Sequence, residues 1–205
     1  MIWWPEEVPT LVGINSKSQS TITLRPISPA DAHNVFLGVQ DPEIPRFTSI
    51  PSIYPIESAL SFTGARERRR FHDKSEIVFV IEDTSLTSFK DSNDGGSNSR
   101  GNFAGVISLH TIDLGTQKAE VGYWLAKEAR GFGICTKAIE MITDYGLFTI
   151  GFQRILAKVN TENMASKKAL LNAGYTQCNS KVEEVTNKDG LPIELALYEV
   201  KQVSI

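Results

Sequence analysis

The feature that most constrains this chain is a strand-like stretch followed by a glycine-rich turn and then a helix. Residues 120–125 (EVGYWL) alternate and are rich in branched and aromatic side chains, which predicts a strand. Residues 130–135 (RGFGIC) open a segment whose apolar residues recur at helical spacing: Ile134, Ala138, Met141, Ile142, Tyr145 and Phe148. A helix that begins after such a turn presents free backbone N–H groups and a partial positive charge to an anion. The stretch suggests a phosphate or pyrophosphate site, although two glycines one residue apart are also common in ordinary turns.

Two other phosphate-binding motifs do not match this stretch. A dinucleotide-binding fingerprint has a third glycine three residues after Gly133, where this chain has Thr136. A P-loop needs Gly-Lys-Ser/Thr after a four-residue gap, and the chain contains no such run.

Composition limits the classes of partner. A chain of 205 residues fits one domain, and a formal net charge of -3 gives no electrostatic footprint for nucleic acid. The first residues have neither a basic region nor a long apolar run, and no segment is apolar for long enough to span a membrane. Two cysteines and three scattered histidines predict neither a disulfide framework nor a metal site. We therefore expect a cytoplasmic protein with reduced thiols and with no metal, nucleic-acid or membrane partner.

The rest of the chain mixes strands and helices in one domain, residues 20–205. Alternating apolar stretches predict further strands at residues 21–27, 76–82, 102–110, 154–159, 182–186 and 194–200. Helical spacing and capping residues predict helices at residues 31–39, 56–71, 163–173 and from 134 to a stop at Gly151. Residues 1–19 are expected to form an N-terminal arm whose Trp3 and Trp4 fold back onto the domain rather than meet a partner. Residues 83–101 are crowded with Ser, Asn, Asp and Gly, which predicts a flexible insert.

Four local motifs together resemble the GNAT N-acetyltransferase superfamily. Its pyrophosphate loop has the pattern Arg/Gln-x-x-Gly-x-Gly/Ala, which Arg130, Gly133 and Cys135 follow, except that Cys135 replaces the usual Gly or Ala. The other motifs look like those of the RimJ/RimL-type branch, which includes ribosomal-protein N-terminal acetyltransferases. They are Leu24-Arg25-Pro26, the central strand 119–125 (AEVGYWL), and Asn163-x-x-Ser166 followed by Gly174-Tyr175.

The resemblance implies both the fold class and the reaction. The implied α/β (α+β) GNAT fold has a central, mostly antiparallel, twisted sheet of about seven strands flanked by helices. A splayed parallel pair in that sheet forms the cofactor slot. The implied activity is direct transfer of acetyl from acetyl-CoA to a primary amine, on a protein N-terminus or a small molecule, by a monomer or homodimer. The alternative is a non-catalytic coenzyme A-binding protein on the same scaffold.

The resemblance also assigns cofactor-binding residues. The loop is implied to hold the pyrophosphate through backbone N–H groups, with Arg130 adding charge. Main-chain groups of the central strand are implied to pair with the pantetheine arm, and one N–H to serve as the oxyanion donor. The implied cofactor-binding residues are Tyr123, Trp124, Leu125, Arg130, Gly131, Phe132, Gly133, Ile134, Cys135, Asn163 and Ser166.

Two residues are implied to be catalytic. Glu120 is the candidate base for the amine, with an exposed strand-end carboxylate as the alternative. Ser166 is implied to donate a hydrogen bond to the coenzyme A sulfur, because the position where many GNAT enzymes have a tyrosine is Leu170 here. The alternative for Ser166 is a simple helix-start residue. Cys135 is expected to be a small packing residue rather than a nucleophile, because no histidine lies in a recognisable partner motif.

Overall fold

One sheet organises the molecule. The structure, a computed structural model, describes residues 2–86, 103–178 and 183–202. Within these ranges, nine strands follow the order β1-β2-β3-β4-β5-β6-β9-β7, with β8 paired to β9, and only the β5–β6 pair is parallel. The strands are β1 (Leu11–Ile14), β2 (Thr21–Pro26), β3 (Glu76–Asp83), β4 (Phe103–Asp113), β5 (Lys118–Leu125), β6 (Arg154–Asn160), β7 (Thr176–Gln177), β8 (Glu183–Thr186) and β9 (Pro192–Lys201).

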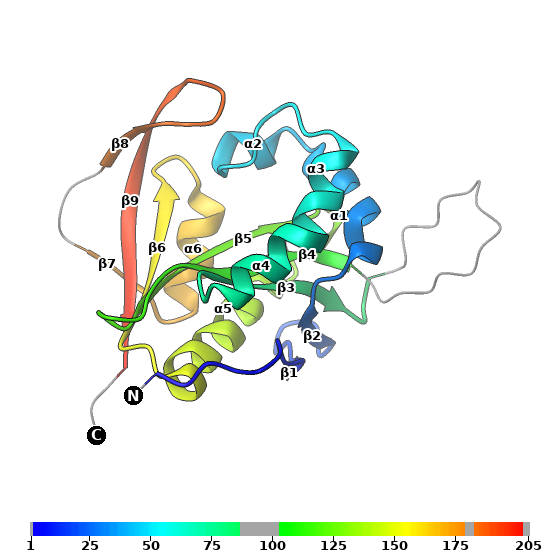
Figure 1. The fold of residues 1–205 in the computed structure, drawn as a ribbon. Coiled ribbons are helices and arrows are strands. Elements are labelled where there is room, and N and C mark those ends of the chain that lie inside the picture. The colour runs from blue at the N-terminus through cyan, green and yellow to red at the C-terminus, as the bar shows by residue number, and fades with distance from the viewer. Residues whose placement is uncertain (1, 87–102, 179–182, 203–205) are drawn as a thin grey trace.

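Helices cover both faces of the sheet (Figure 1). The helices before β3 lie on one face, called here the α1–α4 face, and the later ones lie on the α5–α6 face. None of the helices in the described ranges is long and apolar enough to cross a membrane. The helices are α1 (Ala32–Val39), α2 (Glu43–Phe47), α3 (Ile56–Ser61), α4 (Glu67–His72), α5 (Ile134–Asp144) and α6 (Met164–Asn172), with short 3-10 or π segments η1 (Pro29–Asp31), η2 (Phe62–Arg66), η3 (Lys127–Ala129) and η4 (Tyr145–Ile150).

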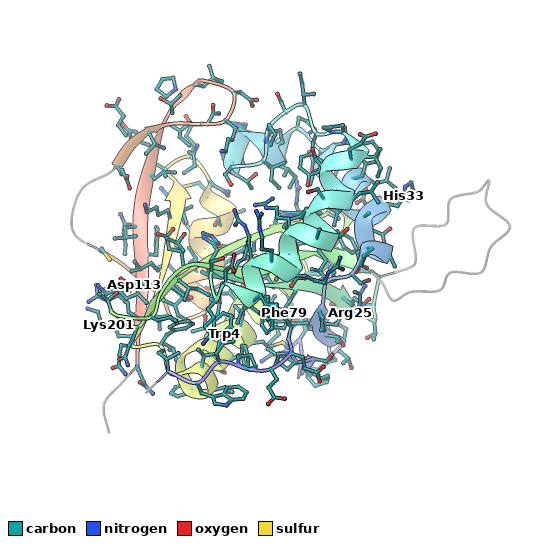
Figure 2. The ribbon with its side chains drawn as sticks, in the orientation of Figure 1. Trp4, Arg25, His33, Phe79, Asp113 and Lys201 are labelled. Carbon is teal, nitrogen blue, oxygen red and sulfur yellow. The ribbon has the colours of Figure 1, made fainter. Side chains whose placement is uncertain are left out.

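The core consists of two apolar clusters, one on each face of the sheet. Successive side chains of a strand point to opposite faces, so β3, which is buried on both, contributes to both clusters. Phe79 packs with the cluster under α5 and α6, whereas its neighbour Val80 packs with the cluster under α1 and α3. Figure 2 shows Phe79 in the interior and Asp113 and Lys201 at the periphery. The central strands are therefore fixed from both sides.

The predicted fold class is confirmed, and the sheet is larger than expected. The additional strands are β1 and β7, and β1 belongs to the segment expected as an arm. The helix expected over residues 56–71 is divided into α3, η2 and α4, because Gly64 has non-helical dihedral angles. Asp83 is a buried residue of β3, while residues 87–101 of the expected insert, and Val182 of the expected hairpin, lie outside the described residues.

The N-terminal segment packs against the domain. The Trp3 N–H donates to the carbonyl of Ile150, with 2.8 Å between nitrogen and oxygen. The Trp4 ring lies 5.5 Å from the ring of Phe71, centroid to centroid, and Trp3 is 54% exposed. This segment thus links the end of η4 to α4.

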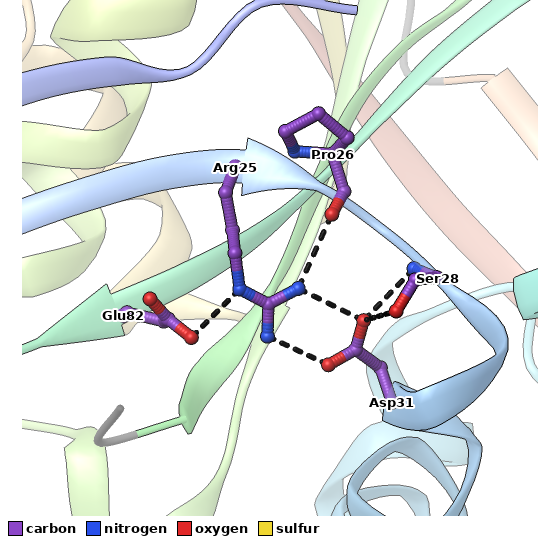
Figure 3. A network of polar contacts seen from close by, with 5 residues as sticks. All are labelled: Arg25, Pro26, Ser28, Asp31 and Glu82. Atoms are coloured by element: carbon purple, nitrogen blue, oxygen red, sulfur yellow. Dashed lines mark hydrogen bonds and ion pairs between the residues drawn. The ribbon is translucent and has the colours of Figure 1, made fainter. Parts of the chain in front are cut away.

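A partly buried ion network explains why an arginine follows Leu24 in the opening motif (Figure 3). The Arg25 guanidinium bonds to both carboxylate oxygens of Asp31, at 2.6 and 2.9 Å, and to Glu82 of β3 at 2.7 Å. Burial disfavours the charge on Asp31, but the bonds from Arg25 and Ser28 outweigh it and lower the pKa of that carboxyl. The motif therefore joins β2, β3 and the start of α1, and has a structural role.

Asp31→Asn tests this network. Losing charged hydrogen bonds from a side chain that is 2% exposed should lower the free energy of unfolding by about 2–3 kcal/mol at neutral pH. Because the folded pKa of Asp31 is depressed, its contribution is present above the unfolded pKa of about 3.9 and disappears as pH falls through the folded pKa. Denaturant unfolding from pH 7 to 3 should show the two proteins converging. Glu43→Gln, which removes an exposed ion pair with Arg46, is the matched control and should change the free energy of unfolding far less, because exposed pairs contribute little.

Candidate active site

The parallel pair at the centre of the sheet is short. Backbone pairing between β5 and β6 consists of three positions and ends at Glu120 and Leu156. Beyond that point β5 stays paired with β4 as far as Leu125, and β6 stays paired with β9 as far as Asn160. The edge of β5 that faces β6 therefore has no strand partner over residues 121–125 among the residues that the structure describes. Buried backbone groups need hydrogen-bond partners, so this split can accept a ligand that carries amides.

The glycine-rich loop lies at the end of the split and has the geometry of an anion site. Gly131 and Gly133 have φ values of +88° and +85°, which residues with a side chain rarely adopt. Gly133 is the N-cap of α5 and lacks a side chain to cap the helix. Among the bonds formed within the described ranges, none takes up the N–H groups of residues 131–136. These groups are thus available to an anion.

Arg130 is occupied within the protein. Its guanidinium donates two hydrogen bonds to the carbonyl of Leu125, at 2.9 and 3.1 Å. It also forms an ion pair with Asp41, just after α1, at 2.7 Å. In this arrangement Arg130 ties the loop to the end of β5 and to the α1–α4 face, so the loop's anion-binding capacity lies in its backbone.

The turn between β1 and β2 supports the loop from the other side. The Asn15 side-chain amide donates to the carbonyl of Phe132 at 3.0 Å, and the Lys17 ammonium donates to that of Gly131 at 2.5 Å. A Cβ on Gly133 would lie 3.2 Å from the Asn15 Oδ1 atom. Sequence reasoning missed this support because the partners are more than 110 residues apart and no local pattern links them.

Tyr123 and Ser166 meet on the α5–α6 face. Their hydroxyl oxygens are 2.7 Å apart, and Asn163 caps α6 by accepting a hydrogen bond from the Ser166 N–H at 3.0 Å. Burial raises the pKa of the Tyr123 phenol well above its usual value, so it stays protonated at neutral pH. If the phenol donates to Ser166, the hydroxyl hydrogen of Ser166 is free for another acceptor. The sequence predicted Ser166 and Asn163 but not the role of the Tyr123 hydroxyl.

Three other predicted positions, Trp124, Ile134 and Cys135, have packing roles for their side chains, as does Leu170 at the position where many GNAT enzymes have a tyrosine. Trp124 is 7% exposed and packs against Phe103 and against Gly38 of α1, so its side chain belongs to the core. Leu170 is fully buried. Burial raises the pKa of the Cys135 thiol to about 12, which leaves it protonated and a poor nucleophile. Ile134 is fully buried, whereas Phe132 is 50% exposed on the loop.

Glu120 lies on the opposite, α1–α4 face, where the split begins. Its carboxylate is 4.0 Å from the Lys158 ammonium of β6, and Lys158 also pairs with Glu183 at 3.3 Å. Glu120 is partly buried rather than fully exposed, with 17% of its side chain accessible.

A cavity of about 750 Å3 opens at the carboxyl end of β6, near Asn160. It lies between α2, the end of β6 and the β8–β9 hairpin, and Asn160 forms part of its wall. Four carboxylates line it, those of Glu162, Glu184, Asp189 and Glu194, against one guanidinium, that of Arg46. The cavity is therefore acidic and lies close to the split.

A sheet that splits at its parallel pair, with a glycine-rich loop and helix N-terminus at the split, defines an acetyltransferase of the coenzyme A-dependent class. The chain belongs to the acetyltransferase (GNAT) domain family, whose model matches residues 21–176. The resemblance to this superfamily is thereby confirmed, as is the acyltransferase activity. Proteins of the RimJ/RimL type are among the homologues, including the ribosomal-protein-serine acetyltransferase of Escherichia coli, which is 30% identical over 71 residues (35% of this chain and 40% of that one). Members of the family use acetyl-CoA as the acetyl donor.

Similar proteins agree with this assignment. The chain is 30% identical over 156 residues to the probable N-acetyltransferase YjcK of Bacillus subtilis, covering 76% of this chain and 80% of that one. It is 25% identical over 179 residues to the uncharacterized N-acetyltransferase YoaA of the same organism, covering 87% and 92%. Among solved structures, Mycobacterium smegmatis RimJ in complex with a coenzyme A disulfide has a TM-score of 0.76 at 21% identity, covering 95% and 88%.

Replacing Gly133 with valine tests the loop. Coenzyme A at 100 times its Kd should stabilise the native protein by about 2.7 kcal/mol and raise Tm by roughly 5–10 °C. Gly133→Val should abolish that rise for two reasons. A branched side chain disfavours the positive φ that the loop has at this position, and its Cβ would press against the Asn15 side chain.

Gly190→Val is the matched control. Gly190 has a similar φ of +83° in the β8–β9 turn, and a Cβ there meets no atom within 4 Å. This variant should lose stability yet keep the rise with coenzyme A. An undiminished rise in a folded Gly133→Val protein would remove the loop from the cofactor site.

Proposed function

We propose that this protein transfers acetyl from acetyl-CoA, held by the loop 131–135, to a primary amine that carries further positive charge. The observation that carries the proposal is the set of N–H groups at residues 131–136 that have no partner within the described ranges and lie beyond Leu125, at the far end of the split between β5 and β6. A pyrophosphate bound there would direct the pantetheine arm toward the split.

The acetyl group would then lie along the unpartnered edge of β5. The main-chain groups of Tyr123 and the N–H of Leu125 are suited to pair with the pantetheine amides, because β6 has left that edge free. The Leu125 carbonyl is already bonded by Arg130, and the main-chain groups of Trp124 face Val106 of β4. A backbone N–H of the same edge can donate to the carbonyl oxygen as it gains negative charge. This assigns β5 two tasks, alignment of the cofactor and polarisation of the thioester.

Ser166 is proposed to stabilise the departing sulfur. The Tyr123 phenol, 2.7 Å away, is proposed to orient Ser166 by donating to its oxygen, which frees the Ser166 hydrogen for the thiolate. Asn163 holds the start of α6 and so fixes the position of Ser166. Glu120 stays a prediction for the base that accepts the proton of the amine.

The acidic cavity is the proposed entrance for the acceptor amine. Its Glu184 and Glu194 are directly opposite each other in the β8–β9 pair, and like charges at such a position destabilise a sheet. A cationic acceptor would offset that repulsion while it is bound. We further propose a cytoplasmic location, in keeping with two cysteines that are both free thiols.

A test of the activity uses acetyl-CoA with spermidine, a short peptide with a free N-terminal serine and a lysine side chain, and benzylamine. Release of free thiol should accompany acetylation of at least one of them. We expect the first two to have the higher kcat/KM and to lose that advantage as NaCl is raised, because exposed charges are screened. Absence of transfer to every amine tried would refute the proposed reaction.

Glu184→Gln tests whether the acidic cavity is the entrance for the acceptor amine. Removing one of the facing carboxylates should raise KM for spermidine severalfold, leave benzylamine unaffected, and raise Tm slightly by relieving the repulsion. Loss of affinity together with a gain of stability distinguishes a binding residue from a structural one. A lower Tm with unchanged KM for spermidine would contradict the assignment.

The leaving-group assignment is tested with three variants. Ser166→Ala should lower kcat by about tenfold to a thousandfold with little change in coenzyme A affinity, because the bond strengthens only as sulfur gains charge. Tyr123→Phe should have a smaller effect in the same direction. The control is Tyr145→Phe, which removes a buried hydroxyl that has no hydrogen-bond partner in the described structure. If kcat holds in Ser166→Ala while Tm falls, Ser166 is only a helix residue.

A further inference from the structure

An acid–histidine–acid row crosses three strands on the α1–α4 face. Glu76 of β3 is paired with His110 of β4, and His110 is paired with Glu120 of β5. Residues paired across strands point to the same face, so the three side chains are neighbours. Within the described ranges, no group of three such side chains is arranged to hold a metal ion. Another role for the row is needed, and His110 is the only one of its members that changes charge near neutral pH when unperturbed.

The His110 ring lies over the central strand at the split. A Cβ on Gly122 would be 2.7 Å from the Nε2 atom of His110, so the imidazole occupies the space that this glycine leaves. Gly122 lies two residues beyond Glu120, the last residue of β5 that pairs with β6. The ring nitrogen is thus held beside the first open part of the slot in which the proposed function lays the thioester.

The second ring nitrogen is held by a strained neighbour. The Nδ1 atom of His110 is 2.8 Å from the hydroxyl oxygen of Thr111. Thr111 has a φ of +49°, in the left-handed region, and lies where the β4–β5 register shifts. A branched residue in that conformation is strained, and such strain concentrates at functional sites. When the Nδ1–H donates to Thr111, the Nε2 lone pair faces Gly122 and is free to accept a proton.

Burial favours the neutral form of the His110 ring at rest, and the charges around the ring oppose each other. Burial lowers the pKa of the His110 imidazole below its usual value, and Arg70 of α4 and Lys158 of β6 lower it further. The carboxylates of Glu120 and Glu76 act in the opposite direction. Arg70 is itself engaged by Glu76 at 2.7 Å. A neutral imidazole flanked by two carboxylates can accept a proton and have the resulting cation stabilised.

We propose that Nε2 of His110, rather than the carboxylate of Glu120, takes the proton from the attacking amine. The inference rests on the proposed acetyl transfer. The amine nitrogen bonds to the acetyl carbon while its proton moves to Nε2. The carbon–sulfur bond breaks with its electron pair going to sulfur, and the imidazolium later gives the proton to water. Glu120 is then a positioning residue that stabilises the imidazolium.

Proton-transfer chemistry favours this division of roles. A general base works best when its pKa lies near the working pH. An ordinary imidazole, at about 6.5, is closer to neutrality than an ordinary glutamate, at about 4.3. The Glu120 carboxylate is also already engaged by the Lys158 ammonium, 4.0 Å away.

The pH dependence of kcat/KM separates the two residues. The whole protein is assayed with acetyl-CoA and whichever of spermidine and the seryl peptide is acetylated faster. His110→Gln should lower kcat/KM by about a hundredfold to ten-thousandfold at pH 7. It should also remove the fall in kcat/KM at low pH that protonation of the enzyme's base causes, called here the acid limb, so that only the ionisation of the amine still shapes the profile. Glu120→Gln should keep that limb and move it to lower pH, because the carboxylate that raises the pKa of His110 is gone. The opposite pattern, with the limb lost in Glu120→Gln and kept in His110→Gln, overturns the proposal.

Two further measurements guard against misfolding. Tm and coenzyme A affinity of each variant should stay close to those of the wild type, as should those of His72→Gln, which removes an exposed histidine at the end of α4. Imidazole added to His110→Ala should restore activity at least tenfold, because the space over Gly122 is then vacant. A fully active His110→Gln, or a folded His110→Ala that imidazole does not rescue, contradicts the role of His110. If the wild type acetylates no amine at all, the proposed function fails instead.

Discussion

The short parallel pairing of β5 and β6 is the constraint on which the rest of the site depends. Three paired positions hold the strands together, and from Glu120 onward each strand is held only by its outer neighbour. A continuous ladder would satisfy the backbone of β5 but leave no slot. The burial of β3 and β4 on both faces stabilises the sheet without those missing bonds. The interior therefore tolerates an opening at its centre.

Neighbouring side chains hold the loop of residues 131–135 in place, although the loop itself is rich in glycine. Arg130 anchors it to β5 and Asp41, and the turn containing Asn15 and Lys17 supports it from the side of β1. The glycines allow the loop its positive φ values, and the bonds from these side chains limit its movement. A preorganised loop loses less conformational freedom when an anion binds, which favours affinity.

Much of the fold could be predicted from the sequence because periodicity and caps are local signals. The strand at 119–125, the cap at Asn163 and the turn at Gly133 each depend on residues close in the chain. β1 was missed because it has four residues, with Val12 and Ile14 more than half exposed, so no buried alternation marks it. The His110 ring over Gly122 and the Tyr123–Ser166 contact depend on how distant segments meet, which no spacing rule encodes.

Neighbouring residues of β5 point to opposite faces, and this has a kinetic consequence. Gly122, with the His110 ring above it, is on the α1–α4 face, and Tyr123, with Ser166, is on the α5–α6 face. An acceptor arriving on one side and a thiol departing on the other do not compete for one opening. Both substrates can then be bound together before any bond changes. The buried, protonated Cys135 is a poor nucleophile for storing acetyl, so the proposed roles of these residues would lead to turnover through a ternary complex rather than by a ping-pong cycle.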